Sequence, residues 1–376
     1  MMEGAMEFKI KRDIFLEGIQ KTLGIVEKKT TMPILNNVLI KADHNGLKII
    51  ATDREIGLVA DYEAQILQEG DITLSARKLY EMIREIQGEM IHFKKNEQLV
   101  VTLTSQKSIY KIPGIASDDF PSVAVDDDVK LFKIRGNVLK DMILKTSFSM
   151  STDEIRKNLN GIFFDMDQDH AGVLKAVATD GHRLSMVSVY SGDKDFLKLE
   201  KGIIIPRKGV SEIRKLLESE SGDIFIGVHH GTCVLKTDHT MLKVSLIDAD
   251  YPDYRRVIPS EKGTEVRFEK DIALHALRRM NVISSERYSG VIIKLTEGKM
   301  ILNSTNPDVG EANDEIEVSC PAGELEVGYN VNYLIDAIEA VDEKNIVFEI
   351  GSGMKPGVIR PADNDKFFCI IMPLRI

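Results

Sequence analysis

One short segment of the sequence combines residue types that could perform acid–base chemistry. Thr179-Asp180-Gly181-His182-Arg183-Leu184 places a carboxylate two residues before an imidazole, and such a pair can pass protons in a hydrolytic reaction. No nucleophile elbow accompanies it, and the matching segments Thr52-Asp53-Arg54 and Thr305-Asn306-Pro307 contain no histidine. We therefore favour a non-catalytic role, with a hydrolase-type enzyme using Asp180 and His182 as one alternative.

No other motif predicts a cofactor or a metal. The sequence has no GxxxxGK[ST] loop for cradling phosphates. His229, His230 and His239 lie near Cys233, but without the spacing of a metal-ligand set. The three cysteines are far apart and form no CxxC pair, which is typical of a protein from a reducing compartment. We expect no catalytic residue, no cofactor and no metal.

Length and composition indicate a folded protein of several domains. The 376 residues allow two or three domains, and 43% hydrophobic with 29% charged residues is ordinary for a globular chain. The net charge of −10 argues, taken alone, against a protein that wraps nucleic acid. No apolar run approaches the roughly 18 residues of a membrane helix, and the start lacks a signal-peptide pattern. We expect a cytoplasmic protein without a membrane partner.

The elements that position the Thr-Asp segment belong to a repeat that occurs three times. Each copy opens with a short strand and an amphipathic helix, and continues with a strand–turn–strand pair ending in Thr-Asp or Thr-Asn. A second strand and helix follow, and further strands close the copy. The openings are FKIKRDIFLEGIQKTLGIV from Phe8, FKIRGNVLKDMILKTSFSM from Phe132 and RFEKDIALHALRRMNVIS from Arg267.

This order predicts an α+β protein of three similar domains, over 6–129, 130–262 and 263–376. Turn signals such as Asn45-Gly46 and Glu297-Gly298 predict antiparallel hairpins. Because the two helices stand at corresponding places in each copy, we expect them to share one face of the sheet.

The predicted helices carry a positive charge that the rest of the chain lacks. Six windows (9–29, 133–145, 77–87, 207–217, 269–281 and 330–342) hold 20 Lys and Arg against 12 Asp and Glu, which leaves −18 for the remainder. Such a stripe suits sequence-independent contact with phosphates, although the last helix, with Asp336, Glu339 and Asp342, opposes it. The predicted DNA contacts are Lys29, Arg77, Arg84, Lys140, Lys145, Arg156, Lys157, Arg207, Lys208, Arg214, Arg278 and Arg279, with Lys28 beside them.

Five longer motifs resemble the bacterial DNA polymerase III beta subunit, the replicative sliding clamp family. They are Pro33-Ile34-Leu35, Ala178 to Leu184, Ile205 to Gly209, Pro252 to Val257 and Met372 to Arg375. The resemblance implies a ring-forming homodimer around duplex DNA, with sheets outside and helices inside. It also implies a hydrophobic groove for short motifs of the polymerase III catalytic subunit, the clamp loader and repair proteins.

Carried over by motif, the groove comprises Leu159, Thr179, Gly181, His182, Arg183, Leu184, Pro252, Arg256, Val257, Asn330, Tyr333, Met354, Met372, Pro373 and Leu374. The implied dimer contacts are Tyr110 and Ile112 with Val282 and Ile283. Where the family often has two aromatics, this chain has Lys157-Asn158, which favours plain phosphate contact.

Domain size independently favours a ring of two chains. A domain of about 125 residues is roughly 36 Å across. Three touching spheres of that size leave a hole of about 6 Å, whereas six in a planar ring leave about 36 Å, wider than a duplex of roughly 20 Å. A monomeric scaffold that binds no DNA is the second alternative.

Overall fold

The chain folds into two compact units, seen here in a computed structural model. The structure describes residues 5–26, 32–124, 128–191, 199–219, 222–285, 289–321, 323–351 and 353–375. The first unit comprises Met1–Asn137 and Ser211–Leu246, and the second comprises Val138–Val210 and Ile247–Ile376. The second of the three predicted repeats therefore contributes to both units.

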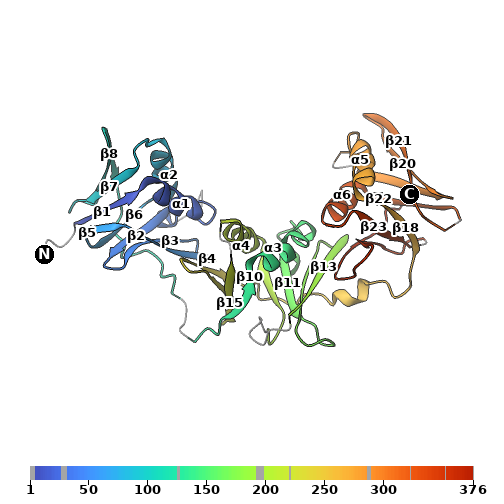
Figure 1. The fold of residues 1–376 in the computed structure, drawn as a ribbon, viewed down its shortest axis with the longest axis horizontal. Helices are drawn as coiled ribbons and strands as arrows, with labels where there is room; N and C mark the ends of the chain where they lie inside the picture. Colours follow the sequence, from blue (N-terminus) through green and yellow to red (C-terminus); the bar gives the residue numbers. More distant parts are fainter. Residues whose placement is uncertain are drawn as a thin grey trace. The chain divides into compact units, whose positions relative to one another are not determined.

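Helices occur where the apolar periodicity predicts them, two in each repeat. Their bounds are α1 Arg12–Thr22, α2 Ala76–Glu85, α3 Gly136–Leu144, α4 Arg207–Ser219, α5 Lys270–Asn281 and α6 Val331–Glu339. Four short 3-10 helices accompany them: η1 Pro33–Asn36, η2 Ser147–Ser149, η3 Lys157–Leu159 and η4 Tyr254–Val257. Asp13 and Asp271 lie in first turns, as expected for acids at positive helix ends. In the first unit α1 packs against α2, and in the second α5 packs against α6 (Figure 1).

Two antiparallel sheets form the first unit. One has the order β5-β1-β7-β8-β9 and the other the order β10-β15-β16-β17-β4-β3-β2-β6. The strands of the first sheet are β1 Met6–Lys11, β5 Gln65–Gln68, β7 Met90–Lys95, β8 Val100–Ser105 and β9 Ser108–Pro113. Those of the second are β2 Asn37–Asp43, β3 Gly46–Thr52, β4 Ile56–Tyr62, β6 Gly70–Ser75, β10 Phe132–Arg135, β15 Asp223–His229, β16 Thr232–Lys236 and β17 Thr240–Ser245.

The second unit also has two antiparallel sheets, in the orders β14-β11-β12-β13-β25-β24-β23-β18 and β21-β20-β19-β22. The first comprises β11 Gly161–Met166, β12 Val173–Thr179, β13 Arg183–Tyr190, β14 Ile203–Pro206, β18 Thr264–Glu269, β23 Asn345–Ile350, β24 Gly357–Pro361 and β25 Phe367–Ile371. The second comprises β19 Gly290–Thr296, β20 Lys299–Asn306, β21 Gly310–Glu317 and β22 Leu325–Asn330. The predicted α+β class with three antiparallel clamp-type repeats is confirmed.

Neighbouring repeats are joined by strand pairing. In the first unit β17 pairs with β4, with Lys243 opposite Gly57. In the second unit β25 pairs with β13, with Ile370 opposite Leu184. Each eight-stranded sheet is thus four strands of one repeat continued by four of the next, which is why the middle repeat is divided between the units.

Apolar side chains from helices and alternate strand positions form the cores. In the first unit Phe8 stacks on Phe93, with ring centroids 4.5 Å apart, and Phe15 of α1 meets both rings edge-on. Gly18 lets α1 approach the strands closely, because a Cβ there would lie 2.6 Å from Ile49 Cδ1. This packing fixes the helices and leaves strand ends and turns to form binding surfaces.

Candidate functional site

The turn between β12 and β13 is held by its own side chains. The Thr179 hydroxyl donates to the Arg183 carbonyl at 2.6 Å and accepts from the Gly181 amide at 3.1 Å. Asp180 Oδ1 accepts from the amides of His182 and Arg183 at 2.8 and 2.9 Å. Gly181 has a φ of +90°, which a side chain would strain. Asp180 is therefore used to shape the turn.

Arg183 connects this turn to two other elements. Its Nε donates to Asp180 Oδ2 at 3.2 Å, and its Nη1 donates to Asp336 Oδ2 of α6 at 2.5 Å. Its Nη2 donates to the Phe148 carbonyl of η2, and the guanidinium lies 4.3 Å from the centre of the Tyr333 ring. The side chain is only 12% exposed. Sequence reasoning placed Arg183 in the site but missed Asp336 and Phe148, because their proximity depends on long-range packing.

An apolar cluster lies beneath the turn. It contains Leu184, Val177, Met186, Tyr254 and Ile370, all buried. Burial raises the pKa of Tyr254 to about 12, so its hydroxyl stays neutral at physiological pH. The cluster joins β12, β13, β25 and η4, and it forms a firm base for the surface above.

The chain end crosses from one sheet of the second unit to the other. The Met372 amide donates to the His182 carbonyl at 2.9 Å, and the Leu374 amide donates to the Gly328 carbonyl at 2.8 Å. Asn330 caps α6 by accepting from the amides of Asn332 and Tyr333. The tail, the β12–β13 turn and the start of α6 are thereby held together.

Four of the predicted groove members are apolar side chains that are open to solvent. Val257, Met354, Met372 and Leu374 are exposed by 47%, 53%, 39% and 41% of their surface. We call this surface, with the β12–β13 turn and the start of α6, the second-junction groove. Of the other predicted members, Pro252, Arg256, Gly181 and His182 are exposed, Thr179, Arg183, Asn330 and Tyr333 are half-buried, and Leu159, Leu184 and Pro373 are buried. Among the described residues, no hydrogen bond, ion pair or ring contact joins Leu159 or Met354 to the other members.

The predicted DNA-contacting cations differ in whether a carboxylate of the same chain forms an ion pair with them. Arg77 and Lys157 are exposed, and Lys140 is half-buried. Carboxylate partners within the chain hold Arg84 (Glu85), Lys145 (Asp141 and Asp342), Arg156 (Asp153), Arg214 (Glu218), Arg278 (Glu339) and Arg279 (Asp314). Lys208 is exposed and has a partner of its own. Lys28 and Lys29 lie outside the described residues.

Two of these cations are held by hydrogen bonds within the chain. Burial lowers the pKa of Lys145, but hydrogen bonds to Asp342 and Asp141 outweigh this effect and leave the pKa above its ordinary value. Arg207 Nη2 donates to the carbonyls of Met150 at 2.6 Å and Ser151 at 2.9 Å. Arg207 thus ties the loop that carries Arg156 to the start of α4.

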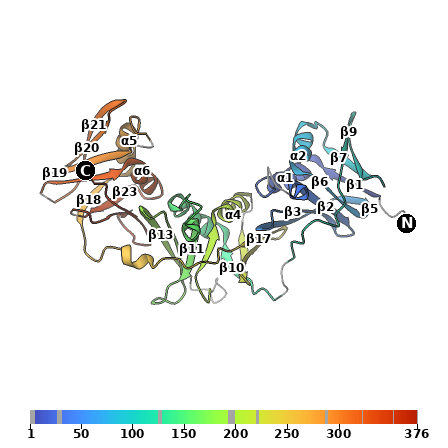
Figure 2. The same cartoon turned by 180° about the vertical axis from the view of Figure 1, so that it is seen from behind.

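The predicted dimer contacts lie on β9 of the first unit and just after α5 of the second. Val282, just after α5, is 80% exposed, and Ile283 beside it is half-buried. On β9, Tyr110 is half-buried and Ile112 packs under its own sheet, whereas Ile109, which sequence reasoning missed, is 63% exposed. Figure 2 shows β9 in the first unit, where it forms one edge of its sheet.

The described part of the chain holds no group of three or more His, Cys, Asp or Glu placed to bind a metal ion. Within the same residues, no helix is long and apolar enough to span a membrane.

Replacing Arg183 by methionine should destabilise the second unit strongly. The change keeps most of the side-chain volume but leaves Asp180, Asp336 and the Phe148 carbonyl without their donor, at an expected cost of about 3 kcal/mol. Arg156→Met is the matched control, since Arg156 also contacts the turn but is 43% exposed and should contribute below about 1 kcal/mol. Urea unfolding followed by circular dichroism measures both, and equal losses would contradict the structural role of Arg183.

Comparison with known proteins accounts for the whole chain. Residues 6–124, 133–253 and 255–375 match the N-terminal, central and C-terminal domains of the DNA polymerase III beta subunit. The beta sliding clamp of Pseudomonas aeruginosa is 30% identical over 375 residues, covering 99% of this chain and 100% of the relative.

Solved structures agree in fold over the same length. A sliding clamp from Bartonella birtlesii bound to griselimycin has a TM-score of 0.93 at 30% identity, covering 99% of this chain and 100% of that one. The Caulobacter crescentus (C. crescentus) beta sliding clamp has a TM-score of 0.94 at 28% identity, with the same coverage. With three successive domain models matched in order, this chain belongs to the DNA polymerase III beta subunit family.

Proposed function

We propose that this chain is a sliding clamp: two copies close head-to-tail into a ring around duplex DNA, and the ring tethers replication and repair proteins without catalysing a reaction. The observation that carries this proposal is that two of the strands that end a sheet, β9 and β21, correspond to the strands that join the repeats within the chain. The repeats are joined by pairing of β4 with β17 and of β13 with β25, while β9 and β21 each end a sheet. These are the two strands that the same joint would bring together between chains.

Strand register identifies β9 as the counterpart of β17 and β25. Counting starts two residues before the first helix of each repeat, crosses to the opposite residue of the next strand, moves two residues along that strand, and then crosses two further strands. In the first repeat it runs Ile10, Ile91, Phe93, Leu103, Tyr110. The corresponding runs are Ile134, Ile224, Ile226, Leu235, Leu242 and Phe268, Ile346, Phe348, Ile359, Cys369. Tyr110 therefore corresponds to Leu242 and Cys369.

The same reasoning identifies β21 as the counterpart of β4 and β13. Thr52 lies opposite Gly57, Thr179 opposite Leu184 and Thr305 opposite Glu311. Within the chain, the residue after Leu242 faces Gly57 and the residue after Cys369 faces Leu184. Between chains, Lys111 would consequently face Glu311.

Charge supports this pairing. Four residues further along, Lys107 would face Glu315. The equivalent residues of the first unit, His239 and Asp61, are paired, since the Asp61 amide donates to the His239 carbonyl. Opposite charges directly across an antiparallel pair are favourable, and the exposed Ile109 and Val282 supply apolar surface beside them. An unpaired strand edge is otherwise a site for unwanted association, so closure by a second copy also protects the chain.

The helix cations support contact with DNA that is loose and independent of sequence. Arg77, Lys140 and Lys157 offer charge to phosphates, whereas Arg278 and Arg279 share theirs with carboxylates. Phosphate contacts carry no base information, so a ring of this kind can move along any duplex.

The second-junction groove supports the tethering of partners. Its exposed apolar side chains, with two methionines among them, suit short motifs of varied sequence. We expect partners of this class to include the polymerase III catalytic subunit and the clamp loader, and we therefore expect the chain to act in the cytoplasm. Because a threaded ring keeps its cargo near DNA, even micromolar motifs, about −8 kcal/mol each, are sufficient.

The alternatives find less support. Both oxygens of Asp180 accept hydrogen bonds from the turn and from Arg183, which leaves the carboxylate poorly placed to act as a base for His182. A monomeric scaffold would leave β9 and β21 unpaired.

Threading predicts that retention depends on DNA topology. The protein is incubated with linear duplex carrying biotin at both ends, and streptavidin is added either before or after the protein. Capping after incubation should trap rings that survive 0.5 M NaCl, whereas capping first should prevent entry, because a topological link is insensitive to salt and phosphate contact is not. Gel filtration of the DNA-bound fraction measures retention, and equal retention with both orders of addition would refute threading.

The predicted register can be tested by exchanging the two opposite charges at the dimer edge. Lys111→Glu places two carboxylates opposite each other at both joints of the ring, and should weaken dimerisation about tenfold. Adding Glu311→Lys to the same chain should restore the affinity, because each joint then has opposite charges again. Sedimentation equilibrium measures the dissociation constant, with Lys41→Glu as the control, since Lys41 is an exposed residue of β2. Failure of the double variant to recover would show that the register is wrong.

A further inference from the structure

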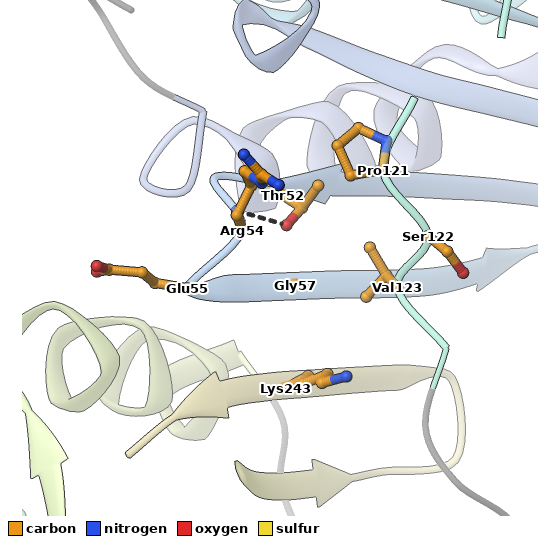
Figure 3. Close-up of a pocket in the computed structure, with 8 residues that line it drawn as sticks. All are labelled: Thr52, Arg54, Glu55, Gly57, Pro121, Ser122, Val123 and Lys243. Carbon is orange, nitrogen blue, oxygen red and sulfur yellow. Dashed lines mark hydrogen bonds between the residues drawn. The ribbon is translucent and has the colours of Figure 1, made fainter. Parts of the chain in front are cut away.

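A second groove lies within the first unit, where the first two repeats meet. Its walls are the β3–β4 turn, the segment 121–123 that leads towards the second repeat, and β17 (Figure 3). The hollow measures about 240 Å³. We call it the first-junction groove.

The first-junction groove is the structural counterpart of the second-junction groove. Thr52 accepts from the Arg54 amide at 2.9 Å, as Thr179 does from the Gly181 amide. Gly57 and Lys243 face each other across β4 and β17, in the register of Leu184 and Ile370. A segment connecting two repeats borders each groove: Val123 lies in the first, and Tyr254 of η4 packs against Leu184 at the second.

The chemistry of the two grooves differs. Where the second junction has buried Leu184 and Ile370, the first has Gly57 and the ammonium-bearing Lys243. The space left by Gly57 is filled from the connecting segment, since a Cβ there would lie 2.3 Å from Val123 Cγ1. The first-junction groove is therefore more polar at these positions than its counterpart.

Arg54 occupies a position that favours glycine. Its φ is +81°, and the equivalent residue Gly181 has a φ of +90°. An L-residue with a side chain carries a strain of roughly 1–2 kcal/mol in this region, and retained strain of this kind is characteristic of functional positions. The turn is fixed by Asp53, whose Oδ1 accepts from the amides of Glu55 and Ile56 at 2.9 and 2.6 Å.

The two cations of the groove have uncharged partners. Arg54 Nη1 lies 3.8 Å from Met32 Sδ, and Lys243 Nζ donates to the Ala124 carbonyl at 2.9 Å. Within the described residues, neither forms an ion pair with a carboxylate. Glu55 also borders the hollow, but Figure 3 shows its carboxylate pointing away from the connecting segment, while Arg54 and Lys243 lie on either side of the strand that carries Gly57.

We propose that the first-junction groove binds an extended acidic segment of a partner protein, with carboxylates reaching Arg54 and Lys243 in turn. The hollow is smaller than the roughly 300–1,000 Å³ of sites for cofactors and drug-sized ligands, so it accommodates one or two side chains. The connecting segment limits the hollow to the width of one or two side chains, so a DNA duplex cannot enter it. This inference goes beyond the proposed ring, because the groove lies in one unit and needs neither a second copy nor DNA.

Fluorescence anisotropy tests the proposal with a labelled decapeptide of alternating aspartate and glycine. The full-length protein should bind it in preference to the matching lysine–glycine peptide. Arg54→Gly and Lys243→Met should each raise the dissociation constant about tenfold, as expected when a charged hydrogen bond is lost. Gln106→Gly is the matched control, since Gln106 is exposed, has a φ of +51° and lies outside the groove; it should leave binding unchanged.

Melting temperature separates binding from a structural role. Arg54→Gly relieves backbone strain, so its melting temperature should equal or exceed that of the parent. A lowered melting temperature with unchanged peptide affinity would overturn the proposal, as would equal binding of the lysine peptide. Displacement of the peptide by a ten-nucleotide single strand or by inorganic phosphate, at concentrations equal to its own, would assign the groove to nucleic acid or free anions and refute a peptide partner.

Discussion

Every backbone amide and carbonyl along the edge of a β-sheet needs a partner, and this requirement organises the whole chain. A repeat with two sheets presents an edge strand on each side. Backbone groups of an edge strand that lack a partner within the protein can pair with a strand of another molecule. Within the chain the edges are satisfied by their neighbours, β4 by β17 and β13 by β25. The counterparts of these joined strands, β9 and β21, each end a sheet, so the proposed second copy of the same chain would match both.

The same joints create the binding surfaces. Where two repeats pair, a turn, a connecting segment and a strand end converge, and a groove results at each joint. Side chains then decide its chemistry. At the second junction Leu184 and Ile370 build an apolar base beneath exposed methionines. At the first, Gly57 and Lys243 stand at those positions, and Arg54 replaces a glycine. The two joints thus share one geometry, and their side chains suit ligands of different chemistry.

How much the sequence predicts depends on the range of the interaction. Helices and hairpins follow from local periodicity and from turns such as Asn45-Gly46, and all of them are present. The pairing of β4 with β17 joins residues nearly half the chain apart, and no local pattern indicates it. Arg183 was placed in the site by its motif, but its partner Asp336 was interpreted only as an acid on the last helix. The positive φ of Arg54 was equally hidden, since only alignment with Gly181 in three dimensions reveals the strain.

Several of the cations proposed to contact DNA already form ion pairs with carboxylates of the same chain, which reduces their attraction for phosphates. Lys145 is held by two aspartates, and Arg278 and Arg279 by one carboxylate each. A cation already paired at the surface loses little free energy when a phosphate departs, because its partner is at hand. If every cation were unpaired, each phosphate contact would add to an affinity that depends steeply on salt and opposes movement. Pairing the cations within the chain lowers that affinity without removing the charge, and topology rather than electrostatic grip can then keep the protein on DNA.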